Sequence, residues 1–507
     1  MQFDRRDFVK SLGAAVAAPA LAAAVSAGAA AQAESPAGET SAAAQAAVRK
    51  RAERPNVILM ICDDLGYGDP GCYGSRLPTP NLDRMALEGM RFTRYNSAHP
   101  ICSASRAALL TGRYAQRSGT KGAYFPHAPS GTALDEQLLS NLFKDRGYRT
   151  ACIGKWHLGD GPAYLPTSRG FDSYYGVPYS DDMKPLPLMR GMEVLEADAD
   201  RDELTPLYTA EAVKFIAENA GEPFFCYMAF SYPHDPARAS ARFKGRSGFG
   251  DYGDSVMEID WSVGEVVQAV EKAGIGADTL ILFTSDHGPW YQGSPGVLRG
   301  RKASTFEGGF RVPFLARWPG TVAAGKVIDS WTSSLDVLPS LVTLCGLQQP
   351  RLPLDGVDVT ASLRGESPVV DDRPRLYFSP MGSGNNVHCV RKGEWKLRVA
   401  QGQGGEIYTN DSTTFAKKSA WLPHAELYNL AADAEESYDV ARQHGDKVRE
   451  LMADLEAEMR TMPDAVRASY TALKDDVGDV TTPPGAAVRP LRKGPLPDWA
   501  WEPDDRR

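Results

Sequence analysis

The residues with the clearest chemical potential surround Cys102, which precedes a short helix-forming run within residues 101–113. Residues 107–110 favour a helix, and the pair Thr111-Gly112 ends it. A cysteine at the start of a helix lies near free backbone amides and the positive end of the helix dipole, where a negative charge is favoured. The position suits a reactive cysteine, and a structural cysteine before a helix is the alternative.

Carboxylates follow two of the predicted strands. Asp63 and Asp64 come directly after the apolar run 56–61, and Asp286 and His287 follow a later apolar run. Carboxylate oxygens suit Ca²⁺ or Mg²⁺, whereas an imidazole is a softer ligand. The residues therefore predict an oxygen-rich metal site at the strand ends, with a solvated turn as the alternative for the Asp-Asp pair.

Five further side chains that could take part in acid-base or anion chemistry lie in predicted loops. They are Lys155 and His157 in a glycine-bounded loop, Ser180 in a polar loop, His234 in a turn, and Lys302 in a glycine-rich segment. Taken singly, each of them also fits an ordinary surface, turn or loop position. Only their combination points to a shared site.

The elements that must position these residues alternate between strand and helix. The continuous apolar run 56–61 is typical of a strand covered on both faces. Residues 81–89 have helical spacing, and Asp254 is predicted to cap a helix that runs to Gly274. Alternation of this kind favours an α/β fold with a wound sheet, whose ligand crevice lies at the strand ends.

The pattern changes after about residue 370. Residues 375–378 and 394–399 are strand-like, and residues 446–460 have the spacing of an amphipathic helix. These elements predict a smaller C-terminal α+β domain over residues 371–470, after a larger domain over residues 55–370 that contains all the candidate residues above and is expected to be catalytic if they form one site. The proline-rich tail 471–507 carries no predicted chemistry.

Composition narrows the possible partners. The 507-residue chain has a net charge of −8, so it offers no basis for nucleic-acid binding and disfavours a bulky polyanion. Seven cysteines at irregular spacing do not form a disulfide scaffold or a zinc cluster. Whether any of the six cysteines other than Cys102 pair is left open.

The first 33 residues resemble an export signal. The twin arginines Arg5 and Arg6 precede an uncharged, alanine-rich run, and residues 31–33 fit a signal-peptidase site. A membrane anchor is the alternative, but the run is only weakly apolar. We therefore expect a cleaved twin-arginine signal peptide over residues 1–33, a linker over 34–54, no stable membrane anchor, and a periplasmic or secreted protein delivered by the twin-arginine machinery.

The pattern Cys-x-Ala-x-Arg followed by Leu-Thr-Gly, at Cys102 and Arg106, resembles the signature of the type I sulfatases in the alkaline phosphatase superfamily. Residues 242–245 and 252–260 resemble the branch that contains arylsulfatase A. The resemblance implies a large mixed, mostly parallel sheet flanked by helices, with a short antiparallel sheet in the C-terminal domain. It also implies that a formylglycine-generating enzyme oxidises Cys102 to formylglycine (3-oxoalanine), whose hydrate is the nucleophile.

The resemblance further assigns the other site residues. Arg106 holds the modified side chain, and one divalent cation, with calcium expected, is bound by residue 102 together with Asp63, Asp64, Asp286 and His287. His287 departs from the asparagine of many family members, which leaves Mg²⁺ or another ion open. Substrate contacts are implied for Lys155, Ser180, His234 and Lys302, of which His234 and Lys302 assist the leaving group. His157 is implied to take the proton that expels sulfate.

The resemblance thus predicts hydrolysis of a small aryl or carbohydrate sulfate to an alcohol or phenol and inorganic sulfate. Two alternatives remain at this stage. A phosphonate monoester or phosphodiester hydrolase uses the same formylglycine. A non-catalytic anion-binding relative would keep its cysteine unmodified.

Overall fold

The computed structural model describes residues 54–366, 371–380, 383–402 and 419–475. The expected signal peptide, residues 34–53 of the expected linker, and residues 476–507 of the expected tail lie outside these ranges. None of the helices within the described residues combines the length and the apolar character needed to cross a membrane.

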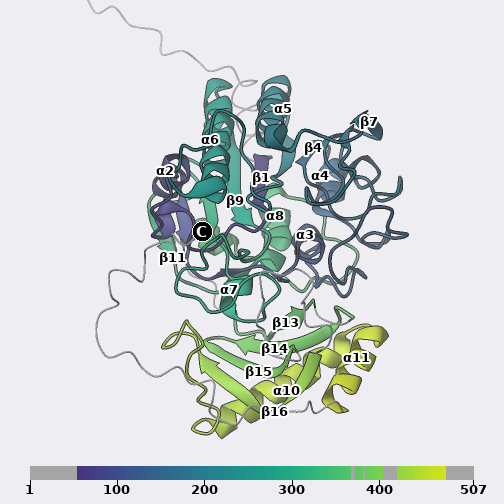
Figure 1. The fold of residues 1–507 in the computed structure, drawn as a ribbon, viewed down its shortest axis with the longest axis vertical. Coiled ribbons are helices and arrows are strands. Elements are labelled where there is room, and N and C mark those ends of the chain that lie inside the picture. Colours follow the sequence, from purple (N-terminus) through teal and green to yellow (C-terminus); the bar gives the residue numbers. More distant parts are fainter. Residues whose placement is uncertain (1–53, 367–370, 381–382, 403–418, 476–507) are drawn as a thin grey trace, which may run out of the picture. The chain divides into compact units, whose positions relative to one another are not determined.

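A ten-stranded sheet forms the centre of the described chain, in the order β11-β2-β10-β9-β1-β8-β4-β5-β6-β7 (Figure 1). The strands are β1 (Asn56–Cys62), β2 (Met90–Phe92), β4 (Arg149–Gly154), β5 (Ser173–Gly176), β6 (Leu188–Arg190), β7 (Glu193–Glu196), β8 (Phe224–Ala229), β9 (Thr279–Ser285), β10 (Phe314–Arg317) and β11 (Lys326–Ile328). The five strands from β9 to β5 in this order are mutually parallel, whereas β10, β6 and β7 pair antiparallel with their neighbours. The predicted mixed, mostly parallel sheet is confirmed.

Both faces of the sheet are buried, as the unbroken apolar run of β1 predicts. Val57 and Leu59 pack in the same hydrophobic cluster as α3 (Cys102–Thr111), α4 (Leu139–Asp145) and α8 (Val337–Cys345). Ile58 and Met60 pack in the cluster on the opposite face, with α2 (Pro80–Glu88), α5 (Leu204–Asn219) and α6 (Gly250–Lys272). Side chains alternate between the two faces of a strand, so only a strand covered on both sides needs every position apolar.

The parallel strands bring the predicted site residues to one edge of the sheet. The registers place Cys62 beside Ser285 and Ile61 beside Ala229, so β1, β9 and β8 end at the same level. β4 ends there too, because Gly154 pairs with Ala229. The carboxyl edge of an open α/β sheet is where ligands bind, and the loops after these strands carry the candidate residues.

A smaller four-stranded antiparallel sheet follows, in the order β13-β14-β15-β16, drawn in green to yellow in Figure 1. Its strands are β13 (Arg375–Ser379), β14 (Asn386–Lys392), β15 (Trp395–Gly402) and β16 (Ser419–Asn429), and α10 (Gly445–Thr461) and α11 (Asp464–Asp475) pack on it. Its apolar residues join the cluster that contains α3 and α8. The short antiparallel sheet is confirmed, while the domain boundaries stay predictions. α11 continues beyond residue 471, where the tail was predicted to begin.

The remaining elements are short. They are the paired strands β3 (Tyr95–Asn96) and β12 (Thr332–Ser333), the helices α7 (Glu307–Phe310) and α9 (Thr360–Leu363), and the 3₁₀ turns Gly71–Tyr73, Pro166–Ser168, Arg201–Glu203, Gly276–Asp278 and Ser334–Asp336. All seven cysteines lie in the described residues, and none of them forms a disulfide.

One local prediction was wrong. Asp254 does not cap α6, because the helix begins four residues earlier, at Gly250. Its carboxylate instead accepts hydrogen bonds from the backbone amides of Gly245 and Ser247, at 2.6 and 2.8 Å. A capping aspartate binds amides of its own helix, whereas Asp254 holds the loop before the helix.

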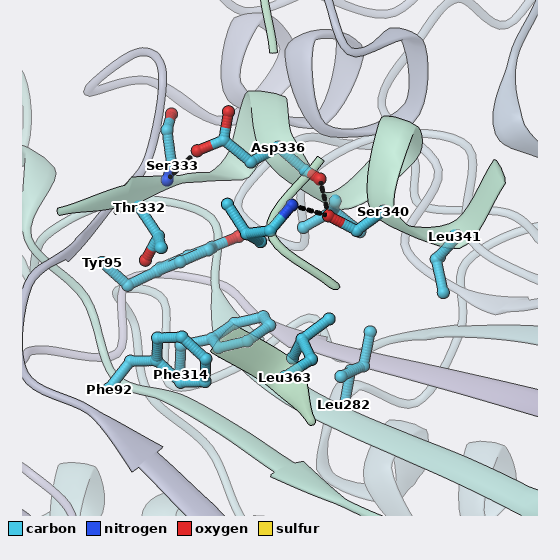
Figure 2. Close-up of a pocket in the computed structure, with 12 residues that line it drawn as sticks. Phe92, Tyr95, Leu282, Phe314, Thr332, Ser333, Asp336, Ser340, Leu341 and Leu363 are labelled. Atoms are coloured by element: carbon cyan, nitrogen blue, oxygen red, sulfur yellow. Dashed lines mark hydrogen bonds between the residues drawn. The ribbon is translucent and has the colours of Figure 1, made fainter. Parts of the chain in front are cut away.

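Figure 2 shows an interior cavity beside α8, lined by Phe92, Tyr95, Phe314 and Leu282 among other residues. Its volume is about 10 Å³, the space of one water molecule. It is apolar and lies in the core, so it is a packing defect and not a substrate site.

Candidate active site

Cys102 is the first residue of α3, and its thiol is buried at the carboxyl edge of the large sheet. The Sγ atom lies 3.3 Å from Oδ1 of Asp63 and 3.3 Å from Nε2 of His287. Asp63 comes from the end of β1 and His287 from the loop after β9. Three segments far apart in the sequence therefore meet at this sulfur.

The thiol of Cys102 is held in its neutral form. Burial, followed by the negative charge of Asp63, raises its pKa well above the ordinary value. The position at a helix N-terminus suggested that a negative charge would be favoured here. Desolvation and the adjacent carboxylate outweigh the helix dipole, so the unmodified side chain is a poor thiolate nucleophile.

A compact set of potential metal ligands surrounds the sulfur. One ligand atom each from Asp63, Asp64, Cys102 and His287 lie within 4.8 Å of one another, and all four residues are buried. Asp286, also predicted as a ligand, lies beside this group. Its Oδ1 accepts from the backbone amides of Asp64 at 3.2 Å and His287 at 2.9 Å.

The ring of His287 has a defined orientation. Its Nδ1 lies 2.9 Å from the carbonyl oxygen of Gly288, which can only accept, so Nδ1 carries the proton. In the neutral ring Nε2 then presents a lone pair, 3.5 Å from Oδ1 of Asp64. Two carboxylates and one imidazole nitrogen form a donor set that fits a divalent cation.

Each buried carboxylate of the group has a cationic partner. Lys155 pairs with Asp63, and its Nζ also donates to Oγ of Ser180 at 2.9 Å. Lys302 donates to both carboxylate oxygens of Asp64, at 2.8 and 2.9 Å.

The third pair joins Arg106 and Asp286. Nε and Nη2 of Arg106 both lie 3.1 Å from Oδ2 of Asp286, and Nη1 donates to the carbonyl of Lys155 at 3.2 Å. Arg106 is completely buried. Three cations thus converge on one small volume, where they can neutralise an anionic substrate.

His157 is a neutral imidazole with one nitrogen available. Nε2 lies 2.9 Å from the carbonyl oxygen of Tyr124 and donates to it. Within the described chain Nδ1 has no hydrogen-bond partner. Burial and the neighbouring charge of Lys155 lower the pKa of His157 well below its ordinary value, so Nδ1 carries a lone pair and can accept a proton.

The pKa of His234 is shifted in the opposite direction from that of His157. Burial and Lys302 disfavour a charged ring, but the carboxylates of Asp64 and Asp63 raise its pKa to about 9. Nε2 lies 3.9 Å from Oδ2 of Asp64, and Nδ1 lies 3.2 Å from Oδ1 of Asp181. His157 and His234 are therefore an acceptor and a donor of protons, respectively.

The backbone is strained at two of these residues and at Ala303, which directly follows Lys302. Asp64, His157 and Ala303 have φ angles of 66°, 61° and 67°, in the left-handed region that non-glycine residues rarely adopt. Glycine is required just before Lys155, because a Cβ on Gly154 would lie 1.9 Å from the carbonyl oxygen of Ala229. Strain of this kind concentrates at functional sites.

The structure gathers every predicted site residue into one buried region. These residues are Asp63, Asp64, Cys102, Arg106, Lys155, His157, Ser180, His234, Asp286, His287 and Lys302. Sequence reasoning assigned no role to Asp181 or to the carbonyl of Tyr124. Asp181 directly follows Ser180, which was the available signal, whereas a backbone carbonyl leaves no signal in side-chain patterns.

Residues 55–347 match a family model described as Sulfatase. The chain belongs to the sulfatase family. This sulfatase is 38% identical over 434 residues to arylsulfatase A of Bos taurus, covering 78% of this chain and 85% of that protein. It is 40% identical over 419 residues to N-acetylgalactosamine-6-sulfatase of Rattus norvegicus, covering 76% and 78%. The predicted arylsulfatase A-like branch is confirmed.

Solved structures agree with this assignment. A sulfatase from Pseudoalteromonas sp. superposes with a TM-score of 0.71 at 27% identity, covering 82% of this chain and 94% of that one. A sulfatase from Bacteroides thetaiotaomicron, described in the metabolism of glycosaminoglycans, gives a TM-score of 0.72 at 26% identity, covering 80% and 99%. This sulfatase has the alkaline phosphatase-like fold and is a sulfuric ester hydrolase.

Proposed function

We propose that this sulfatase hydrolyses small aryl or carbohydrate sulfate monoesters with a formylglycine at residue 102. The observation that carries the proposal is the position of Cys102. Its neutral thiol lies among three buried cations and a ready-made ligand group. A formylglycine-generating enzyme would oxidise this side chain before the protein acts.

The residues around Cys102 fit this modification. A formylglycine hydrate supplies a hydroxyl nucleophile without requiring a thiolate, which burial and Asp63 oppose. The carboxylate of Asp63 and Nε2 of His287, each 3.3 Å from Sγ, can accept hydrogen bonds from polar atoms at this place. A cysteine kept only for packing would need no such partners.

One divalent cation, calcium in our proposal, is held by Asp63, Asp64, His287 and residue 102, with Asp286 beside them. The carboxylates suit a hard cation, and the lone pair of His287 also admits Mg²⁺ or another ion. Such a cation neutralises negative charge on the reacting oxygens. Arg106 and the two backbone amides keep Asp286 from swinging away from this group.

The cationic side chains bind the sulfate group. Lys155, Lys302 and Arg106 supply donors to the sulfuryl oxygens, and Ser180 holds Lys155 in place. These charges are preorganised by buried ion pairs, so they stabilise negative charge as it develops during reaction. They explain how an anion can enter a protein whose net charge is −8.

His234 and His157 divide the proton transfers. His234, with Lys302 beside it, donates a proton to the bridging oxygen so that the alcohol or phenol departs. His157 then accepts a proton through its free Nδ1, which allows inorganic sulfate to leave residue 102. Each ring is in the protonation state that its step requires.

We also propose that residues 1–33 direct export by the twin-arginine machinery to the periplasm or beyond. The support is the Arg5-Arg6 pair ahead of an uncharged run. Replacing both arginines by lysine should leave the uncleaved precursor in the cytoplasm, as measured by fractionation and immunoblotting. Unchanged export would contradict the signal.

The function is tested with matched substrates. Wild type and Cys102→Ala are compared on 4-nitrophenyl sulfate, a 4-nitrophenyl phosphonate monoester and bis(4-nitrophenyl) phosphate. We expect the highest kcat/KM on the sulfate, and a loss of at least about 10⁴-fold in Cys102→Ala with unchanged thermal stability. A higher kcat/KM on either phosphorus ester, or ordinary turnover by Cys102→Ala, would contradict the proposal.

A further inference from the structure

Among the described residues of this site, Asp181 is the one buried carboxylate that is neither a predicted metal ligand nor paired with Arg106, Lys155 or Lys302. It follows Ser180 in the loop after β5 and is only 1% exposed. Within the described chain, neither of its carboxylate oxygens accepts a hydrogen bond of ordinary geometry. A buried carboxylate without partners is costly, so its retention needs a reason.

The group that faces Asp181 is His234. Nδ1 of His234 lies 3.2 Å from Oδ1 of Asp181, and this nitrogen also lacks a well-aligned hydrogen bond within the described residues. The two atoms are at hydrogen-bond distance, and only the angle must improve. Such contacts are often poorly aligned without substrate and tighten when it binds. Two buried groups that lack other partners are therefore placed to satisfy each other.

The opposite edge of the His234 ring faces the reacting groups. Its Nε2 lies 3.9 Å from Oδ2 of Asp64, on the side of the ligand group. The ring thus spans the distance between Asp181 behind it and the site in front of it. An imidazole that accepts or donates through one nitrogen is oriented by the hydrogen bond at the other.

Arg201 connects the loop of Asp181 to the loop of His234. Nε of Arg201 donates to the backbone carbonyl of Asp181 at 2.8 Å, and its Nη2 donates to the carbonyl of Met183 at 3.2 Å. The hydroxyl of Tyr232, two residues before His234, donates to the carbonyl of Arg201 at 2.7 Å. The loop of Asp181 and the loop of His234 are therefore fixed relative to each other.

We propose that Asp181 is a positioning residue, which accepts a hydrogen bond from Nδ1–H of His234 and so directs Nε2–H at the bridging oxygen of the substrate. The inference rests on the proposed function of His234 as the leaving-group acid. As the S–O bond breaks, the proton on Nε2 passes to the departing oxygen. The ring is then neutral and keeps its Nδ1–H on Asp181, so it can take up another proton from water.

The test compares two aryl sulfates that share one aromatic ring and differ in how readily the phenol leaves. Wild type, Asp181→Ala and Asp181→Asn are compared on phenyl sulfate, a poor leaving group, and 4-nitrophenyl sulfate, a good one. We expect kcat/KM to fall by about 10²-fold or more on phenyl sulfate and by less than about tenfold on 4-nitrophenyl sulfate. The exposed neighbour Asp182 supplies the matched control, and Asp182→Asn should change neither value by more than about twofold.

Two further measurements separate positioning from structure. Asp181→Asn should unfold at the same temperature as wild type or higher, because the carboxylate accepts no well-aligned hydrogen bond from the described residues. The double variant Asp181→Ala/His234→Ala should be no slower than His234→Ala alone. Asp181 acts only through His234, so its removal has no further effect once the imidazole is absent. Equal losses on the two substrates, a lower unfolding temperature in Asp181→Asn, or additive losses would each overturn the proposal.

One other arrangement is chemically possible. Asp181, Asp182 and His234 offer ligand atoms within 4.8 Å of one another, so they could hold a second cation. A loss of one bound metal ion per chain in both Asp181→Asn and Asp182→Asn, measured by elemental analysis, would overturn the positioning role. Absence of sulfate turnover by the formylglycine-bearing wild type would overturn the proposed function itself, before any variant is compared.

Discussion

Two clusters of buried charges lie in this sulfatase, and they are built on different plans. The site cluster comprises Asp63, Asp64, Asp286, Arg106, Lys155 and Lys302. The interface cluster joins α7 of the large domain to the small sheet and comprises Glu307, Arg311, Lys396 and Glu436. Both are almost entirely buried, so burial of charge does not by itself mark a site of chemistry.

The interface cluster alternates in sign. Nζ of Lys396 lies 3.1 Å from Glu307 and 2.9 Å from Glu436. The other carboxylate oxygen of Glu307 accepts from Arg311 at 2.8 Å and from Asn96 at 3.1 Å. Lys396 and Arg311, acting against burial, hold the pKa of Glu307 below its ordinary value. Charges arranged in this way neutralise one another, so the cluster has no excess charge that would attract a ligand.

The carboxylates of the site cluster also have cationic partners, but its potential metal ligands point toward one place. The ligand atoms of Asp63, Asp64 and His287 converge within 4.8 Å, a geometry in which they could share one cation. The comparison teaches that convergence of ligand atoms on one place, more than burial or shifted pKa values, distinguishes a reacting site from a structural one.

Breaking the interface cluster should give the largest loss of stability. Lys396→Met leaves Glu307 and Glu436 buried without their shared cation, so the free energy of unfolding should fall by about 3–5 kcal/mol. Urea unfolding measures the loss. In the fraction that remains folded, kcat/KM should match wild type. A fully stable variant, or a folded variant without activity, would contradict the structural role of this cluster.

Removing a cation from the site cluster should affect activity more than stability. Lys302→Ala should lower kcat/KM by about 10²–10³-fold on phenyl sulfate and by a smaller factor on 4-nitrophenyl sulfate, because Lys302 assists departure of the leaving oxygen. Steady-state kinetics on the two esters provide the measurement. Equal losses on both esters would show that Lys302 binds sulfate without a role in the leaving group.

Replacing the predicted metal ligand His287 should change which metal ion the site cluster prefers. His287→Asn replaces an imidazole nitrogen by an amide oxygen, so the preference for Ca²⁺ over Mn²⁺ should rise by about tenfold. Elemental analysis after equilibration with both ions provides the readout, independently of activity. An unchanged ratio in His287→Asn would remove His287 from the ligand group.

The smallest effect concerns backbone strain beside Lys302. Ala303 has a φ of 67°, so Ala303→Gly should relieve strain and, after the entropy of the unfolded chain is counted, stabilise the protein by about 0.5 kcal/mol. Urea unfolding measures the shift, and kcat/KM should stay within about twofold of wild type. A loss of more than about 1 kcal/mol would show that packing of the buried methyl group outweighs strain.

The elements and the motif residues could be read from the sequence because their signals are local. The apolar run of β1 and the helix after Cys102 require no knowledge of distant residues. The resemblance of the motifs supplied the long-range assembly that the local signals lack. The antiparallel strands β10 and β2 at one end of the sheet carry no local sign of their order.

Other features depended on tertiary contacts and could not be predicted. Asp254 looks like a helix cap, yet it binds the preceding loop. Asp64 and His157 have left-handed backbone angles, which residues of these types adopt only occasionally and which no local pattern of the sequence marks. The pairing of Asp181 with His234 joins loops 53 residues apart, which only the folded chain brings together.

The central claim is that residue 102 is a formylglycine, and it is tested most directly by the mass of the tryptic peptide of residues 95–106 from protein matured in its own host. The account predicts a peptide lighter than its sequence mass by the difference between a CH₂SH and a CHO group. Cys102→Ser, matured in the same way, provides the matched control for the peptide assignment. An intact thiol in folded protein that hydrolyses sulfate esters would contradict the account.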